Sequence, residues 1–481
     1  MTLFWLSCIA MAPLRRTNSK TKESRKQSTA RYQPTHRSPT PTLTRQRQDL
    51  KKQQLKQVQR RRKFHAARQA QRERWALIAS DTQRIVMGDG KYVTGSLFAD
   101  QHPVTASSPT SPSFVYFASP QSPAPSQTRF GQDLSQVIIH DIVPCIQLSK
   151  QLSTFYPHTA PAHTDWRRRP TNWRATFATK LSFSNSSTLT AARRLHLLHP
   201  SLHTTPTHAL PTTSIGVLSF ASPRRPGGGY LHGGDQQEET LARSTSLVAS
   251  LDTVQAKEFY KTHKSFSSID GKGIYDHSMV YSPGVVVFRK EDDDTLDDLH
   301  NKSSPRSRTK RNLSLNPQST TNDIPSSLSQ NTIPPYLINV LSSTPPSYAA
   351  IHQTYEITPS TSHIFSSGIR SVLTQRVGRV LRVFEERGDR AIVLGAYGCG
   401  SSEINVGMIA EIWAELLVCG ERSSAGTGGE MKQGRFKDVF EHVVFALPGK
   451  LYAPFKTAFE LRLLETEIND ALEEEWARLY R

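Results

Sequence analysis

The fold is decided by one stretch of sequence, Gly227-Gly228-Gly229-Tyr230-Leu231-His232-Gly233-Gly234-Asp235-Gln236-Gln237-Glu238-Glu239. Its glycines let the backbone adopt positive φ angles and approach a ligand closely, because glycine has no Cβ to clash. Apolar residues recur at helical spacing after Asp235, which predicts a helix from Gln236 to Val248. We therefore expect a loop that surrounds a ligand, followed by a helix that begins with two adjacent carboxylates.

An apolar run from Ile215 to Ala221 precedes this loop and predicts a buried strand. Strand, glycine loop and helix in this order form an α/β unit whose ligand lies at the carboxyl end of the strand. A second such unit is predicted from the strand at Arg390 to Leu394, the loop Gly395-x-x-Gly398-x-Gly400 and a helix from Val406 to Val418. Backbone N–H groups of such a loop, together with the helix start, suit a diphosphate.

The glycine triplet is followed, after a spacer from Tyr230 to Gln236, by Gln237-Glu238-Glu239, and this pattern resembles the signature of the poly(ADP-ribose) glycohydrolase family. The segments 74–92, 173–290 and 336–447 are similar to the microbial-type branch of that family. The resemblance implies an α/β fold of the macrodomain-like type, in which a mixed sheet carries helices on both faces and forms a three-layer domain.

The same resemblance implies roles for individual residues. Glu239 is expected to be the general acid/base, and Glu238 to orient the ribose through its hydroxyl groups. The positions expected to bind substrate are Gly227, Gly228, Gly229, Tyr230, Gln237, Ser219, Gly398, Cys399 and Gly400, with Tyr230 packed on a sugar. Ser219 and Ser222 stand where the family usually has asparagines, and residues 401–405 differ from the family pattern after the second glycine loop. This chemistry requires no metal and no cofactor.

The chemistry follows from the bond to be broken. Cleavage of an O-glycosidic bond between riboses needs a proton on the leaving oxygen and a water at the anomeric carbon. We therefore expect hydrolysis of ribose–ribose bonds in poly(ADP-ribose), or of ADP-ribosylated protein, with release of ADP-ribose. A second hypothesis is a reader module that binds ADP-ribose without hydrolysing it. A third is an adaptor whose basic arm associates with nucleic acid. Two adjacent carboxylates favour the enzyme, because a pocket for a dianionic diphosphate gains nothing from them.

Composition suggests one folded domain with long polar additions. The chain of 481 residues is 36% hydrophobic and has 30 prolines, which is too little apolar sequence for a fully packed chain of this length. We expect a disordered basic arm over residues 1–73 and a glycohydrolase domain over 74–481. Low-complexity insertions are expected at about 101–170 and 291–333, and the acidic run from Glu291 to Asp294 is expected to be solvated.

Nearly all of the net charge of +19 lies in the first 75 residues, which hold 20 Lys and Arg against three acidic residues. Residues 15–74 therefore predict either a charged arm with a targeting role, or weak contact with nucleic acid or with the polyanionic polymer itself. No membrane span is expected, and the composition is compatible with nucleus, cytoplasm or mitochondrion. Four unclustered cysteines favour a reducing compartment and exclude a zinc-spaced cluster.

Several other elements are expected from the pattern of residues. Strands are predicted at 175–178, at 279–289 with a break at Ser-Pro-Gly, at 337–343 and at 443–446, and helices at 75–86, 188–198 and 372–386. The region from 259 to 275 is expected to be a loop. Leu461, Leu464, Ile468, Leu472 and Leu479 mark an acidic C-terminal helix that either packs on the domain or mediates self-association.

Overall fold

The computed structural model describes residues 41–94, 138–169, 177–204, 210–268, 272–294, 331–421 and 433–480. The first 40 residues of the expected basic arm lie outside the described residues, as do the Ser/Pro-rich part of the first expected insertion and residues 295–330 of the second.

A mixed seven-stranded sheet forms the centre of the domain. Its order across the sheet is β3 (Thr154–Tyr156), β8 (Met279–Arg289), β9 (Thr332–Ser343), β7 (Ile215–Phe220), β10 (Ala391–Gly395), β11 (His442–Ala446) and β4 (Lys180–Ser184). The five strands from β9 to β4 run parallel, whereas β8 and β3 add antiparallel strands at one edge. Short hairpin pairs, β1 (Lys91–Thr94) with β2 (Ile138–Asp141) and β5 (His203–Thr204) with β6 (Thr212–Thr213), lie outside this sheet.

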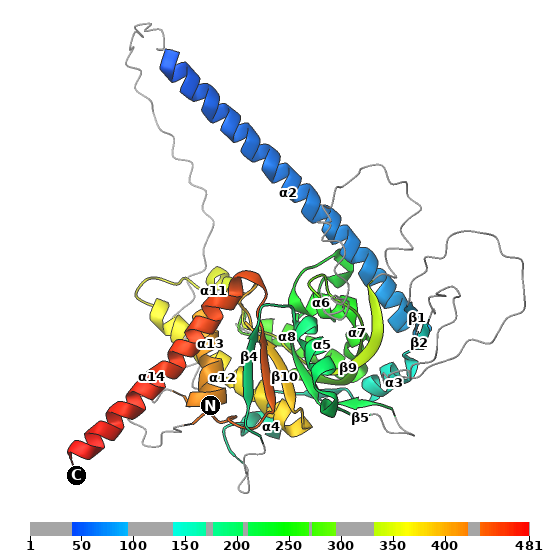
Figure 1. Cartoon of the computed structure of the whole chain (residues 1–481), viewed down its shortest axis with the longest axis vertical. Helices are drawn as coiled ribbons and strands as arrows, with labels where there is room; N and C mark the ends of the chain where they lie inside the picture. The colour runs from blue at the N-terminus through cyan, green and yellow to red at the C-terminus, as the bar shows by residue number, and fades with distance from the viewer. Residues whose placement is uncertain are drawn as a thin grey trace, which may run out of the picture.

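Helices cover both faces of the sheet, which is why the parallel strands are apolar along their whole length. One face carries α5 (Thr188–Leu198), α6 (Gln237–Ser244), α7 (Leu247–Leu251) and α8 (Val254–Ser268). The other carries α12 (Ser362–Arg387), α13 (Val406–Ala414) and the first part of α14 (Tyr452–Leu479). The remaining helices are α3 (Val143–Leu152), α4 (Pro161–Thr164) and α11 (Tyr348–Thr354). Figure 1 shows these layers, and the expected three-layer, mixed α/β architecture is confirmed.

Residues 41–73 of the expected disordered arm belong instead to α2 (Pro41–Met87), a single long helix. Its last turns enter a small core in which Ile85 and Val86 pack with Tyr92 of β1 and Phe288 of β8. The helix ends at Gly88–Gly90, where Gly90 adopts a φ of 62° and a Cβ would collide with Val143. Figure 1 shows the N-terminal part of α2 projecting far from the domain.

The expected insertion at 101–170 is wrong from residue 138 onward. Residues 138–169 form β2, α3, β3 and α4, and β3 is an edge strand of the main sheet. Trp166 is 1% exposed and packs against α12, where a Cβ on Gly378 would lie 2.6 Å from its ring. Trp166 and Gly378 are far apart in the sequence, so local composition cannot predict their contact. The Ser/Pro-rich residues nearby made the whole segment look like an insertion.

Three local expectations are also corrected. Residues 254–268, expected in part as a loop, form α8, because Ala256, Phe259 and His263 share a buried face. The helix expected from Gln236 to Val248 breaks at Thr245, since Ser246 exchanges two hydrogen bonds of 2.9 Å with Val286 of β8. A strand was expected at 175–178. Phe177 and Ala178 are not in a strand, and residues 175–176 lie outside the described residues. The strand in this region is β4, which begins at Lys180.

The acidic run after β8 is hydrogen-bonded to the domain. Asp292 and Asp293 are exposed, as expected for a solvated run, whereas Asp294 is buried. Asp293 accepts hydrogen bonds from the Ser187 backbone N–H (2.6 Å) and hydroxyl (2.7 Å) and from the Thr190 hydroxyl (2.9 Å) at the start of α5. Asp294 forms a buried ion pair of 2.8 Å with Arg193 one turn further along the same helix. The insertion expected at about 291–333 is therefore wrong for residues 291–294 and for residues 332–333, which belong to β9, and residues 295–330 lie outside the described residues.

We expect Asp293→Ala to lower the free energy of unfolding by about 1–2 kcal/mol, because the start of α5 loses an anionic capping partner. Urea unfolding of the purified protein measures the change. Glu258→Ala is the control, since its ion pair with Lys261 is exposed on α8 and should contribute less than about 0.5 kcal/mol. Equal losses in the two variants would contradict the capping role.

Helix α14 packs on the domain through Phe455, Phe459 and Arg462 and then leaves it (Figure 1). The expected apolar positions Leu461, Leu464, Ile468, Leu472 and Leu479 are exposed, so the described residues provide no packing partner for them. Among the helices that the structure describes, none is long and apolar enough to cross a membrane.

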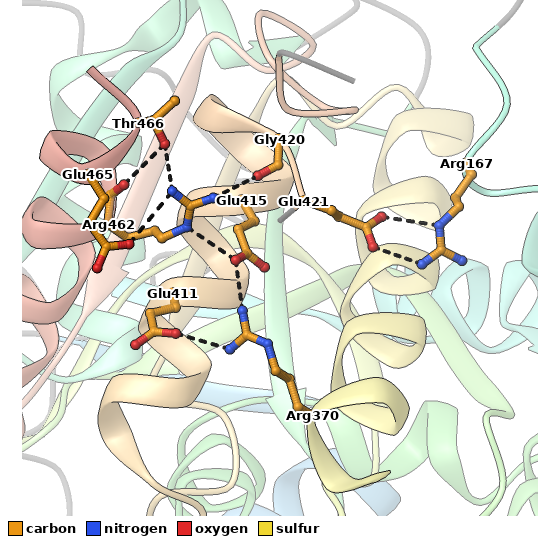
Figure 2. A network of polar contacts seen from close by, with 9 residues as sticks. All are labelled: Arg167, Arg370, Glu411, Glu415, Gly420, Glu421, Arg462, Glu465 and Thr466. Carbon is orange, nitrogen blue, oxygen red and sulfur yellow. Dashed lines mark hydrogen bonds and ion pairs between the residues drawn. The ribbon is translucent and has the colours of Figure 1, made fainter. Parts of the chain in front are cut away.

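Buried charges hold α14 to α12 and α13. Glu415, at the start of the π-helical turn Glu415–Cys419, accepts hydrogen bonds from Arg462 of α14 (3.2 Å) and from Arg370 of α12 (2.7 Å). Arg370 also contacts Glu411 of α13 at 3.1 Å. Figure 2 shows this network, which joins three helices through side chains that are mostly buried.

Candidate active site

A cavity of about 870 Å³ opens at the carboxyl ends of four parallel strands. Its lining includes the ends of β7 and β11 and the residues that follow β9 and β10, namely Phe220, Ala446, Thr344 and Ala396. In open α/β sheets this edge is where ligands bind, because the loops that leave it diverge and leave a crevice. The loop from Ser222 to Gln236 and the start of α6 form one wall of the cavity.

The Glu239 carboxylate lines this cavity within a cradle of backbone and glycine. Its Oε1 accepts a hydrogen bond from the Gly229 N–H (2.7 Å), and its Oε2 accepts one from the Gln236 N–H (2.8 Å). A Cβ on Gly234 would lie 2.1 Å from Glu239 Oε2, and a Cβ on Gly229 would lie 2.7 Å from Oε1. Glycine is therefore needed at both positions to leave room for the carboxylate.

The neighbouring Glu238 carboxylate is almost completely buried, with 1% of the residue exposed. It accepts hydrogen bonds from the backbone N–H groups of Ser222 (2.7 Å) and Gly227 (3.2 Å). Burial raises the pKa of Glu238 to about 8, although these two donors oppose the increase. Glu238 is thus mostly protonated at neutral pH, which leaves the adjacent pair with less negative charge than two ionised carboxylates would carry.

Gln237 ties the start of α6 to the end of β7. Its Oε1 accepts a hydrogen bond from the Phe220 N–H (2.9 Å), and its Nε2 donates to the Leu218 carbonyl (2.8 Å) and to the Thr188 hydroxyl (3.2 Å). These bonds fix the helix relative to the strand, so the two glutamates that follow point into the loop and the cavity. Gln237 also lines the cavity, and its expected role in substrate binding stays a prediction.

The second glycine loop lies on the opposite side of the cavity, where Gly398 and Gly400 line it. Gly398 has a φ of 81°, and a Cβ on Gly400 would lie 3.3 Å from Gln236 Oε1, so the two glycine loops approach each other. Cys399 between them packs against the hydrophobic core and, within the described residues, is not part of the cavity lining. Burial raises the pKa of the Cys399 thiol to about 12, so it remains protonated.

Two expected substrate contacts are directed elsewhere. Tyr230 is 4% exposed and packs with Ala79 of α2 and Ala242 of α6, outside the cavity that the described residues form. Ser219 is fully buried in β7, and its hydroxyl has no hydrogen-bond partner among the described residues. Strand alternation explains Ser219, because successive side chains point to opposite faces of the sheet and the neighbouring Phe220 reaches the cavity instead.

The cavity also contains charged residues that the sequence reasoning did not select. Arg224 and Arg225 line it from the loop that precedes the glycine triplet. Their position directly before Pro226 was the available signal, since two arginines beside a glycine loop suit a phosphate. Glu291 lines the cavity from the end of β8, and burial raises its pKa to about 7. Only the fold brings Glu291 here, because it lies 52 residues beyond Glu239 in the sequence.

The arrangement combines a positioned carboxylic acid pair, two guanidinium groups and a pair of glycine loops in one cavity. Among the described residues, no group of three or more His, Cys, Asp or Glu side chains is placed to hold a metal ion. The site can therefore bind an anionic nucleotide-like ligand and move a proton through a side-chain carboxyl group.

The sheet, its two helical layers and a cavity at the ends of the parallel strands define an α/β protein of the macrodomain-like class. The family model described as "Microbial-type PARG, catalytic domain" matches residues 133–290, where PARG stands for poly(ADP-ribose) glycohydrolase. Residues 133–290 are thus similar to a microbial-type PARG catalytic domain, the family that the glycine and glutamate motif resembles.

A solved structure shares this fold. The crystal structure of poly(ADP-ribose) glycohydrolase from Thermomonospora curvata is 23% identical, with a TM-score of 0.51, and the match covers 81% of this chain and 99% of that chain. The enzyme from Deinococcus radiodurans in complex with ADP-ribose is also 23% identical, with a TM-score of 0.46 and coverage of 67% and 98%. A comparison with curated proteins gave no match.

Proposed function

We propose that this protein hydrolyses the ribose–ribose O-glycosidic bonds of poly(ADP-ribose) and releases ADP-ribose, with Glu239 as the general acid/base. The observation that carries the proposal is the Glu239 carboxylate, which two backbone N–H groups hold at the wall of the cavity. The match of residues 133–290 to the PARG catalytic domain supports the same activity.

In the proposed reaction, Glu239 donates a proton to the oxygen of the leaving ribose as the anomeric carbon gains positive charge. The carboxylate that results then accepts a proton from the attacking water, so one residue serves both half-steps. The backbone donors of Gly229 and Gln236 hold the carboxylate in a fixed orientation before and after the proton moves. Such positioned acid–base catalysis contributes about 10²–10⁴-fold to a rate.

The remaining cavity residues are assigned to substrate binding. A protonated Glu238 can donate a hydrogen bond to a ribose hydroxyl without placing a second charge beside the substrate. Arg224 and Arg225 supply positive charge for the diphosphate, and the backbone of Gly398 and Gly400 provides the close approach that it needs. Tyr230, Ser219 and Cys399 are not included in this assignment, because they pack outside the cavity.

Incubation of the purified full chain with poly(ADP-ribose) tests the proposed function directly. We expect free ADP-ribose to appear, as measured by chromatography, without an added metal or cofactor. Tight binding of ADP-ribose without release from any polymer would instead establish the reader function, in which the same cavity serves recognition alone.

The affinity for ADP-ribose is expected to fall as the pH rises from about 7 through about 8. Glu291 and Glu238 have pKa values raised to about 7 and about 8, so they are neutral below these values and become anionic above them. The two new charges face a dianionic ligand and should weaken binding on the order of tenfold. Calorimetric titration with ADP-ribose measures the change in affinity. Glu291→Gln should remove the part of that change that occurs near pH 7. An affinity that is constant or rises over this range would contradict the assignment.

Two further proposals concern the binding partners of the basic segment and the cellular compartment of the protein. We propose that residues 15–74 make weak, salt-sensitive contact with a polyanion, for which nucleic acid is one candidate, because residues 52–70 within this segment are strongly basic and exposed. Nucleus or cytoplasm is the proposed compartment, with the mitochondrion as the alternative. Imaging of the tagged full chain distinguishes the three.

A further inference from the structure

The outer part of α2 is a continuous basic surface. From Lys52 to Arg74 the helix holds nine Lys and Arg against a single acidic residue, Glu73. Every side chain from Lys52 to Ala70 is exposed. Lys52, Lys56, Arg60 and Lys63 follow one another at spacings of three or four residues, so they share a face of the helix. A polar and charged helix of this kind is not explained by packing on the domain.

The inner end of this surface is bonded to the loop that carries the catalytic candidate. Arg72 donates a hydrogen bond to the Gly233 carbonyl (3.4 Å), and Arg68 forms an ion pair with Asp235 (3.3 Å). The backbone also lies in close contact here, because a Cβ on Gly233 would be 2.0 Å from the Arg72 carbonyl oxygen. Trp75 adds a hydrogen bond of 3.1 Å to Asp292.

This loop is itself part of the cavity wall. Asp235 lines the cavity, and the N–H of the next residue, Gln236, donates to Glu239. The basic surface therefore starts at the edge of the cavity. It extends for about 30 Å from Arg72 to Lys52, at a rise of about 1.5 Å per residue. Figure 1 shows that α2 leaves the domain from the side of α6.

We propose that α2 is a second binding site for poly(ADP-ribose), which holds the units of the polymer that extend out of the cavity. The proposal rests on the proposed function. Each unit outside the cavity carries a diphosphate, so the polymer presents regularly repeated negative charge to the basic helix. A polymer held at Glu239 must leave the cavity past its rim, where Arg68 and Arg72 lie.

The geometry favours this polymer over nucleic acid as the occupant. Binding at the cavity raises the effective concentration of the rest of the same molecule near α2, whereas nucleic acid gains no such advantage. Affinity should consequently increase with the length of the polymer. It should also fall steeply with salt, because each phosphate neutralised by the helix releases counterions.

The test variant neutralises Lys56, Arg60, Arg61 and Lys63 together by substitution with Gln. These side chains are exposed and belong to neither the cavity nor the contacts at Gly233 and Asp235. Helix propensity is little changed, because Gln is about as favourable as Lys and Arg. In the matched control, each Lys at these four positions is replaced by Arg and each Arg by Lys, so every positive charge is kept.

We expect KM for long polymer to rise on the order of tenfold in the neutralised variant, with kcat unchanged. KM for the dimer of ADP-ribose should be unchanged, since it fills the cavity and does not reach the substituted part of α2. The salt dependence of KM for long polymer should also become less steep, by about 0.7 in the logarithmic slope for each lost contact. The charge-conserving control should match the parent.

Equal effects on long polymer and dimer, or no effect on either, would overturn the proposal. A neutralised variant that loses duplex DNA binding but keeps its KM for long polymer would assign the helix to nucleic acid and overturn it as well. Failure of the proposed function is separate, because the parent would then release no ADP-ribose from polymer or dimer. In that case, direct binding of fluorescent polymer to the parent and the variant decides whether α2 holds the polymer.

Discussion

Glu239→Gln is expected to lower the rate of ADP-ribose release from poly(ADP-ribose) by about 10²–10⁴-fold, the usual contribution of a positioned acid–base group. The amide has nearly the shape of the carboxyl group but neither donates nor accepts the proton as the reaction requires. It can still accept one of the two backbone hydrogen bonds that now come from Gly229 and Gln236. The loop and the cavity should therefore persist, and kcat should fall much more than the affinity for ADP-ribose.

Three measurements on the same variant separate catalysis from folding. They are the rate of release, calorimetric binding of ADP-ribose, and the midpoint of urea unfolding. Asp252→Asn is the matched control, because it makes the equivalent carboxylate-to-amide change in an exposed ion pair with Lys257, outside the cavity lining. Release at the parental rate by Glu239→Gln would show that the proton comes from another group, and Glu238 would be the first residue to test.

Glu415→Gln is expected to lower the free energy of unfolding by about 3–5 kcal/mol, because it removes the buried carboxylate that pairs with the Arg462 guanidinium. The other acidic partner of Arg462, Glu465, is exposed and lies 3.9 Å away. The side chains of Glu415 and Arg462 are 4% and 7% exposed, so water cannot replace the lost interaction. Arg370 loses its 2.7 Å contact at the same time, although Glu411 remains beside it (Figure 2). Such a loss is a large fraction of the roughly 5–15 kcal/mol that stabilises an ordinary domain.

Urea unfolding with and without a second substitution tests whether the cost comes from unpaired charge. The double variant Glu415→Leu/Arg462→Leu should be more stable than either single variant, because apolar side chains of similar size need no partner. Glu475→Gln is the surface control, since its pair with Arg478 near the end of α14 is exposed and should contribute less than about 1 kcal/mol. A loss below about 1 kcal/mol for Glu415→Gln would contradict the structural role of the network.

Sequence patterns predicted the centre of the fold because its strands are continuous apolar runs. The strand at 215–221, the helix at 188–198 and the strand at 443–446 were each placed within one residue. The patterns failed where order depends on distant partners. Trp166 needs Gly378 of α12 to become part of the core, and α8 becomes buried only against the sheet. The composition of a short stretch of sequence predicts neither of these contacts.

In the candidate site too, the sequence predicted the residues that are close together in the chain and missed those that only tertiary structure brings together. Gln237, Glu238 and Glu239 lie together with the glycines because a single loop and helix start carry all of them, so their spacing alone determines their proximity. Tyr230 lies in the same loop and Ser219 in the strand before it. Proximity in sequence did not place their side chains in the cavity, because the direction of a side chain depends on the local turn and on the alternation along a strand. Glu291 was missed for the opposite reason, since only tertiary structure brings it to the cavity.

Backbone pairing joins the described residues on either side of two gaps, 95–137 and 295–330. Thr94 is the register partner of Ile138 in the β1–β2 pair, and the Lys290 N–H donates to the Asn331 carbonyl just past the end of β8. Backbone pairing therefore closes the base of each intervening segment, whatever its length. Lengthening a closed loop adds only about 0.6 kcal/mol per doubling. Exchange of residues 95–137 or 295–330 for a peptide of another length therefore tests whether this pairing by itself fixes the flanking strands, with the release of ADP-ribose as the readout.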